Sequence, residues 1–192
     1  MVAWNGARSA SMGLLLLTAN FGPANARDNS AVGDPPTVQI ARDSARGDMV
    51  ERQLLDAHNA ERLRLGLKPL EWSENLAEEA RNWAEQLARI DDLEHSDNSE
   101  RVNIGENLWM GSKGDFSPQE MVDGFIDERK DFTPGTFPDV SATGDWIDVG
   151  HYTQLIWPDT RELGCGIAHN RQSDVLVCRY YPTGNVEGER VP

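Results

Sequence analysis

Residues 150–157 read "GHYTQLIW" and are followed by Pro158. Proline has no amide hydrogen and clashes with the preceding turn, so the stretch predicts a short helix over His151–Trp157 that ends before Pro158. His151 then lies in the first turn, where the helix dipole disfavours a protonated imidazole. A neutral ring can accept a proton or bind a metal ion. His151 is therefore a candidate functional residue.

A carboxylate interrupts the apolar face of the helix expected upstream of this stretch. Four residues in and before "GFIDERKDF" (124–132) step by four, three and four along one helical face: Met121, Phe125, Glu128 and Phe132. A buried carboxylate is costly unless it is paired, hydrogen-bonded, metal-bound or protonated. Glu128 is then either an ion-pair partner that supports the core or a ligand in a cleft.

Two further residues could join these candidates. His95 lies in the polar segment "LEHSDN", and Glu106 lies in "IGENLW", whose apolar residues predict burial around the carboxylate. Two imidazoles and two carboxylates form a plausible ligand set for a divalent cation, with zinc the usual match to histidine. Spacing alone does not establish such a site, because the four residues are far apart in the sequence.

Helical and strand patterns both occur, which favours an α+β fold. Helices are expected after Asp48, after Ser73, and at Ser117, where Glu120 completes a capping box. The fourth helix is the one described above. Strands are expected at "VNIGENLWM" (102–110), "LGCGIAH" (163–169) and "DVLVCRYY" (174–181).

The N-terminal region has the features of an export signal. An apolar run at 12–18 precedes "ANA" (24–26), which has the form of a cleavage site, so residues 1–26 are expected to be a signal peptide. The alternative is a slightly apolar disordered tail. Residues 27–48 are expected to be a flexible linker and 49–192 the folded domain. The protein is therefore expected to be secreted or periplasmic.

The sequence contains two cysteines, Cys165 and Cys178. If the two C-terminal strands pair as a hairpin, the cysteines face each other across it, and facing positions are close enough for a disulfide bond. The alternative is a pair of buried free thiols. An exported protein favours the disulfide.

The charge balance limits the class of partner. The chain has 192 residues with 18 basic and 32 acidic side chains, a net charge of −14. Such a surface repels phosphate backbones and anionic lipids, so nucleic acid is not expected as a partner.

Several motifs together resemble the CAP superfamily, which includes cysteine-rich secretory proteins, venom allergens and plant pathogenesis-related proteins. They occur in family order: "HNAERLRLGLKPLEWSENLAEEARNWAEQLA" (58–88), "GENLW" (105–109), "GHYTQLIW" (150–157) and "VCRYYPTGNVEGE" (177–189). The resemblance implies a CAP/SCP domain with a three-layer α-β-α sandwich around a small antiparallel sheet. Many eukaryotic relatives carry several disulfides and extra C-terminal modules, so a minimal, bacterial-type member is expected.

The resemblance also implies that His95, Glu106, Glu128 and His151 line a central cleft. Three functions stay open at this point. The first is a secreted binding module for a divalent cation, with a small lipid or sterol as a further ligand. The second is a metal-dependent hydrolase or peptidase, although the sequence shows no established catalytic motif. The third is a protein-interaction or defence-type module that uses no metal.

Overall fold

The computed structural model describes residues 36–192. The expected signal peptide (1–26) and the first part of the expected linker (27–35) lie outside the described residues. Helix α1 spans Pro36–Arg64. We expected this helix to begin after Asp48, whereas in the structure it begins at Pro36. Pro36 suits the first turn of a helix, and residues 37–46 contain no glycine or proline to end it.

The central sheet has four strands in the order β1-β4-β5-β2. Strand β5 pairs antiparallel with both of its neighbours, whereas β1 adds to β4 in parallel. The sheet is therefore mixed at one edge, and β2 forms the other edge. The strands are β1 (Glu71–Trp72), β2 (Gly105–Ser112), β4 (Glu162–His169) and β5 (Ser173–Tyr181). A separate two-stranded sheet joins β3 (Gly135–Thr136) to β6 (Arg190–Val191).

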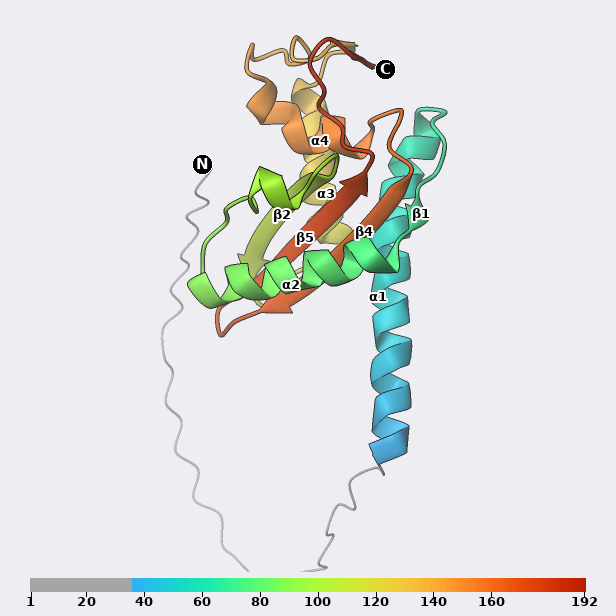
Figure 1. Ribbon diagram of the computed structural model, residues 1–192, viewed down its shortest axis with the longest axis vertical. Helices are drawn as coiled ribbons and strands as arrows, with labels where there is room; N and C mark the ends of the chain where they lie inside the picture. Colours follow the sequence, from blue (N-terminus) through green and yellow to red (C-terminus); the bar gives the residue numbers. More distant parts are fainter. Residues whose placement is uncertain (1–35) are drawn as a thin grey trace, which may run out of the picture. The chain divides into compact units, whose positions relative to one another are not determined.

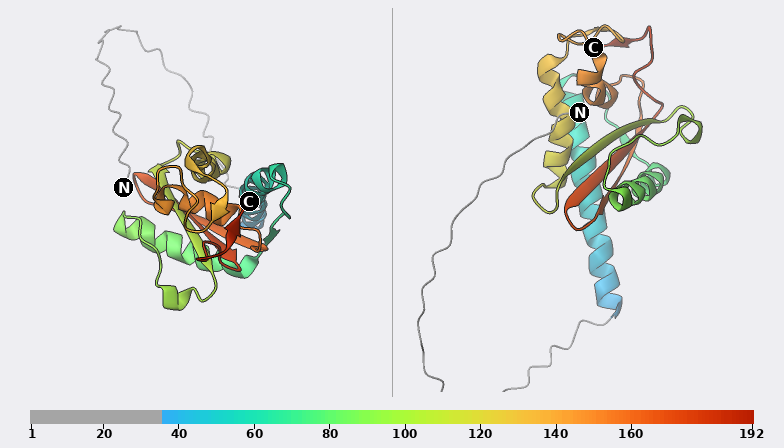
Figure 2. Two further views of the ribbon diagram at one scale, coloured as in Figure 1. Left: turned by 90° about the horizontal axis from the view of Figure 1, so that it is seen from above. Right: turned by 90° about the vertical axis from the view of Figure 1, so that its left-hand side faces the viewer.

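Helices cover both faces of the sheet and give three layers (Figures 1 and 2). Helix α2 packs on one face, and α1, α3 and α4 lie on the other. The helices are α2 (Glu74–Ile90), α3 (Pro118–Ile126) and α4 (Gly150–Leu155), with short 3₁₀ turns η1 (Asn98–Glu100), η2 (Asp127–Asp131) and η3 (Trp146–Val149). This arrangement confirms the predicted α+β, three-layer fold. No helix within residues 36–192 is long and apolar enough to cross a membrane.

The alternation of side chains along β5 separates two apolar clusters. Val175 and Val177 pack in the cluster that α2 covers, whereas Leu176 and Tyr180 belong to the cluster under α1, α3 and α4. This is the period of two expected for a strand with a helix layer on each face.

Two glycines of β4 let α2 approach the sheet closely. A Cβ atom on Gly164 would lie 2.2 Å from the backbone nitrogen of Ala77, and one on Gly166 would lie 2.3 Å from the Cα of Arg81. Any side chain at these positions would push the helix away, so the sequence "LGCGIAH" fixes the depth of the α2 contact.

Cys165 and Cys178 lie opposite each other in the register of β4 and β5 and form a disulfide with an S–S distance of 2.10 Å. The predicted pairing is confirmed. Both cysteines are buried in the cluster on the α1 side of the sheet.

Arg62 is a fully buried cation on α1. Its guanidinium donates four hydrogen bonds, and all four acceptors are backbone carbonyls: Lys68, Leu155, Trp157 and Thr160. Burial lowers its pKa to about 10. Three of these bonds join α1 to the end of α4 and to the chain that follows it.

Candidate functional site

A polar cleft of about 570 Å³ opens at the N-terminal end of β2, the edge strand of the sheet. His95 and His151 both line it, together with Glu106, Asn107 and Trp146. The two imidazoles reach the cleft from different layers, because His95 follows α2 whereas His151 belongs to α4. Strand β2 lies between them.

Glu106 holds the first imidazole. Its Oε1 accepts hydrogen bonds from Nδ1 of His95 (2.9 Å) and the backbone nitrogen of Ser96 (3.0 Å), and its Oε2 accepts one from Oγ of Ser96 (2.8 Å). The guanidinium groups of Arg101 and Arg179 lie 3.6 and 3.4 Å away. Ser96 therefore binds the carboxylate through both its backbone nitrogen and its hydroxyl.

The Glu106 carboxylate is completely buried. Burial alone would raise its pKa, but the hydrogen bonds from His95 and Ser96 and the charge of Arg101 outweigh that effect and lower the pKa below its usual value. The carboxylate therefore stays ionised beside His95.

Glu128 holds the second imidazole and also caps a helix. Its Oε2 accepts from the backbone nitrogens of His151 (2.9 Å) and Tyr152 (3.0 Å), and its Oε1 contacts Nδ1 of His151 at 2.5 Å. Helix α4 has no side-chain cap at its own N-cap position, Val149. Glu128 supplies that cap from another element, and a carboxylate at a helix N-terminus is favourable.

This geometry explains the carboxylate on the apolar face. Phe125, which precedes Glu128 on this face, stacks on the His151 ring at a centroid distance of 5.2 Å. Both residues therefore contact the same imidazole. One detail of the prediction is wrong: α3 ends at Ile126, and Glu128 lies in the 3₁₀ turn η2. The partner of Glu128 is a helix N-terminus and an imidazole rather than an arginine.

Both histidines face their carboxylates through Nδ1. A carboxylate oxygen accepts, so Nδ1 is the protonated nitrogen and Nε2 is left as the metal-binding or proton-accepting atom. This carboxylate–imidazole arrangement is the usual support for a histidine that binds a metal ion.

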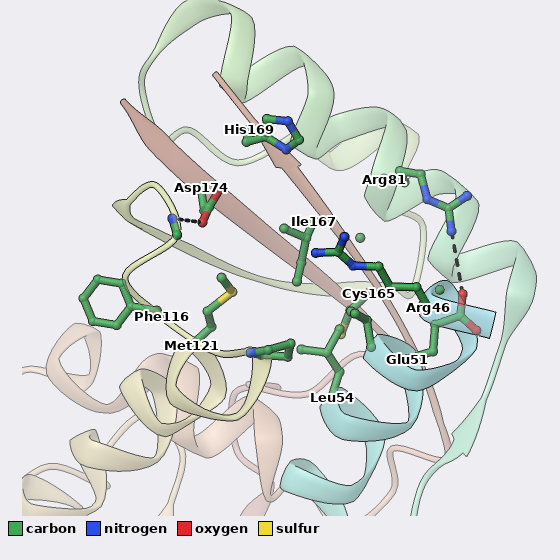
Figure 3. Close-up of a pocket in the computed structure, with 15 residues that line it drawn as sticks. Arg46, Glu51, Leu54, Arg81, Phe116, Met121, Cys165, Ile167, His169 and Asp174 are labelled. Atoms are coloured by element: carbon green, nitrogen blue, oxygen red, sulfur yellow. Dashed lines mark hydrogen bonds and ion pairs between the residues drawn. The ribbon is translucent and has the colours of Figure 1, made fainter. Parts of the chain in front are cut away.

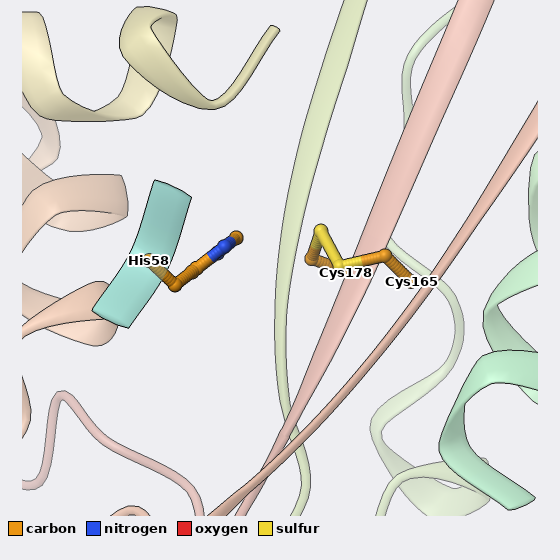
Figure 4. Close-up of side chains that lie close together, drawn as sticks. All are labelled: His58, Cys165 and Cys178. Atoms are coloured by element: carbon orange, nitrogen blue, oxygen red, sulfur yellow. A yellow bond between two sulfur atoms is a disulfide. The ribbon is translucent and has the colours of Figure 1, made fainter. Parts of the chain in front are cut away.

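The four predicted residues lie as two pairs, His95–Glu106 and His151–Glu128. In the part of the chain that the structure describes, one set of three candidate ligand atoms lies within 4.8 Å of one another: those of His58, Cys165 and Cys178 (Figure 4). The sulfurs of that set are in the disulfide, and both nitrogens of His58 are hydrogen-bonded, so it does not hold a metal. Direct binding of one ion by all four predicted residues stays a prediction.

The sequence reasoning missed Asn107 and Trp146. Asn107 follows Glu106 in "GENLW", and strand alternation turns it to the other face of β2, toward α4. Trp146 lies in a polar stretch, and its side chain packs edge-on against Phe137 while remaining 40% exposed at the cleft. Alternation could have identified Asn107, but no sequence signal identifies Trp146.

A second cavity, of about 610 Å³, lies between α1, the start of α3 and strand β4 (Figure 3). Its apolar lining includes Leu54, Met121 and Ile167. The Arg46 side chain extends from α1 toward Ile167, and Arg81 lies at the side of the cavity, where it forms a loose ion pair of 3.8 Å with Glu51. This groove thus combines apolar side chains with two arginines and the carboxylate of Glu51.

The fold and the cleft define a class: an α-β-α sandwich with two histidine–glutamate pairs at the edge of its sheet. The sequence profile of the cysteine-rich secretory protein family matches residues 55–180. The chain belongs to this family, the CAP family.

Similar proteins agree with this assignment. Pathogenesis-related protein 1A of Nicotiana tabacum is 35% identical over 148 residues, which are 76% of this chain and 83% of that protein. Pathogenesis-related protein PR-1 type of Sambucus nigra is 35% identical over 137 residues, 71% of this chain and 78% of that protein.

Solved structures share the fold at lower identity. BmVAL-1 has a TM-score of 0.61 at 24% identity and covers 73% of this chain and 80% of its own. A structure of NaASP2 with Zn²⁺ has a TM-score of 0.61 at 23% identity and covers 72% of this chain and 82% of its own.

Proposed function

We propose that the protein is a secreted binding module whose cleft binds a divalent cation, and that this cation is zinc. His95 and His151 would bind the ion through Nε2, and Glu106 and Glu128 would orient the two rings. One observation carries the proposal: two imidazoles line one cleft, and each is held through Nδ1 by a carboxylate. The structural relative NaASP2 is described with Zn²⁺, and the likeness to it concerns the fold.

Secretion is part of the same proposal. The family assignment, the disulfide and the apolar run before "ANA" (24–26) support export with residues 1–26 as signal peptide. We take the mature domain to include the whole of α1, so its N-terminal boundary lies nearer Pro36 than residue 49.

Zinc titration of the purified protein tests the cation site. Calorimetry and the shift in melting temperature on adding zinc should both show binding in the wild type and lose it in His95→Ala and His151→Ala. His169→Ala is the matched control, because His169 is exposed on β4 and away from this cleft. Glu106→Gln should weaken zinc binding about 10- to 100-fold, the usual effect of removing the partner of a metal-binding histidine. Equal zinc binding by the wild type and both cleft variants would refute the proposal.

The hydrolase alternative shares these residues and differs in outcome. It requires zinc-dependent cleavage of a peptide or ester that disappears in Glu106→Gln or Glu128→Gln. Zinc binding without such turnover supports the binding module. If the protein binds neither zinc nor an amphiphile, the interaction or defence-type function remains.

A second ligand is favoured by the groove of Figure 3. We propose that it takes a small lipid, with the chain on Leu54, Met121 and Ile167 and an anionic head near Arg46 and Arg81. Binding of a fluorescent fatty acid should fall in Ile167→Asp and stay unchanged in His95→Ala, whose side chain lies in the other cavity. A fatty acid that binds both variants alike would refute this assignment.

A further inference from the structure

Asn107 has a buried side-chain amide and is one of the residues that line the cleft. Its side chain is on the α4 side of β2, opposite Cys178 in the strand register, and the residue is 1% exposed. Glu106, its neighbour, faces the opposite layer and holds His95. Asn107 therefore belongs to the His151 half of the cleft.

The hydrogen-bond partners determine which way the amide is turned. One atom of the amide lies 2.9 Å from the carbonyl oxygen of His151. A carbonyl can only accept, so this atom is Nδ2. The same Nδ2 lies 3.1 Å from the hydroxyl of Tyr180.

The donor and acceptor roles continue into the core and agree with this orientation. Nδ1 of His58 lies 2.7 Å from the carbonyl of Leu54, so Nδ1 carries the proton. Burial lowers the pKa of His58 to about 4, so the ring is neutral and its Nε2 accepts from the hydroxyl of Tyr180 at 2.9 Å. The Tyr180 oxygen is then left to accept from Nδ2 of Asn107. The hydrogen bonds thus connect α1 to the backbone of His151, with Nδ2 of Asn107 donating in both directions.

Both hydrogens of Nδ2 are used in this chain, and the side-chain oxygen Oδ1 is left. Among the residues whose side chains the structure describes, no group donates a hydrogen bond to Oδ1. Among the same residues, the fully buried side-chain nitrogen and oxygen atoms that lack a hydrogen-bond partner are Nε1 of Trp72 and Nε of Arg179. Oδ1 of Asn107 also lacks a donor but is not one of them, so it is not fully buried. An amide oxygen at a cleft without a protein donor calls for a water molecule or an ion as its partner.

We propose that Oδ1 of Asn107 accepts a hydrogen bond from a water molecule bound to the cation that His95 and His151 hold. This inference rests on the proposed cation site and adds a residue to it. Two imidazoles leave positions on a tetrahedral zinc ion for water, and such water is a strong donor because the ion polarises it. Asn107 is then a positioning residue for the ion's own water.

The variant Asn107→Asp should change zinc affinity in opposite directions under the two possible roles of Asn107. Aspartate keeps an oxygen where Oδ1 lies and adds a charge, but it cannot donate to the carbonyl of His151. If Oδ1 faces the bound water, the charge-assisted hydrogen bond should tighten zinc binding about fivefold while the zinc-free protein becomes less stable. If Asn107 only braces His151, the loss of its donors should weaken zinc binding instead.

Two further variants complete the design. Asn107→Leu removes the oxygen without adding charge and should weaken zinc about five- to tenfold, in line with one lost hydrogen bond. Tyr180→Phe keeps Oδ1 and removes one partner of Nδ2, so it should lower the melting temperature with little change in zinc affinity. Affinity is measured by calorimetry, and folding is verified by circular dichroism.

The outcomes separate the two proposals. Zinc binding that is unaffected in His95→Ala and His151→Ala overturns the cation site itself. Zinc binding that depends on both histidines, but is no tighter in Asn107→Asp than in the wild type, overturns the role of Asn107 alone. Zinc binding that is lost as strongly in Tyr180→Phe as in Asn107→Leu also overturns it, because bracing would then explain both.

Discussion

His58 should make the stability of the protein depend on pH between about 4 and 6.5. The ring is fully buried on α1, and burial, with a further contribution from the charge of Arg62, lowers its pKa from 6.5 to about 4. Within that interval the unfolded chain carries a proton on His58 and the folded protein does not. Unfolding therefore takes up a proton, and stability falls as the pH falls.

The size of the effect follows from the two pKa values. Each pH unit of the interval changes the free energy of unfolding by about 1.4 kcal/mol, so the titration of His58 contributes a loss of about 3 kcal/mol in stability between pH 7 and pH 4. His58→Gln removes this contribution. The variant should be less stable than the wild type at pH 7, and the difference should shrink by about 3 kcal/mol as the pH falls to 4.

Urea unfolding at pH 4, 5, 6 and 7 gives the free energy of unfolding of the wild type and of His58→Gln. The difference between the two proteins cancels the titration of the other groups, because these are the same in both. His169→Gln is the control, because it makes the same substitution at an exposed histidine on β4. A constant difference between the wild type and His58→Gln across the four pH values would contradict the reasoning, since it would show that His58 titrates alike in the folded and unfolded states.

Three other changes give measurable results. The double variant Cys165→Ala/Cys178→Ala removes a bridge with a sequence separation of 13 and should lower the free energy of urea unfolding by about 3 kcal/mol, as should reduction of the wild type. Arg62→Met leaves four carbonyls without donors and should cost about 4 kcal/mol or more in the same assay, with a value near 1 kcal/mol contradicting the role of the bonds. Glu128→Gln removes the charge that caps α4 and should cost about 1–2 kcal/mol while weakening zinc binding at His151, whereas an unchanged melting temperature would speak against the cap.

Local chemistry made much of the fold predictable. The capping box at Ser117 and Glu120 is present, with both of its hydrogen bonds. The facing positions of Cys165 and Cys178 followed from the hairpin alone, and the register confirms them. Such features depend on residues that are close in sequence or related by the symmetry of a short hairpin.

The start of α1 was missed for a physical reason. The predicted boundary relied on Asp48 as a cap, but a residue that can cap a helix can also lie inside one when nothing upstream ends it. Residues 36–48 lack a strong apolar period, and propensity without a buried face is a weak signal.

The sequence could predict which residues form the site but not how they are arranged in space. Glu128 caps a helix 23 positions further on, and His58 reaches Tyr180 across 122 positions. No local pattern encodes such contacts, because they depend on how α1, α3 and the sheet come together. Local patterns indicated His95, Glu106, Glu128 and His151 as candidates, the family resemblance implied that they share a cleft, and the structure divided them into two pairs.

The position of the cleft at the edge of the sheet has a consequence for how the protein can diverge. Glu106 of β2 holds His95, and Glu128 of η2 holds His151, so each ring is anchored to an element of the fold. The rim, by contrast, is built from the chain around Asn98 and Trp146, outside the long strands and helices. Changes there can alter what enters the cleft while the hydrogen bonds that hold the two rings stay in place.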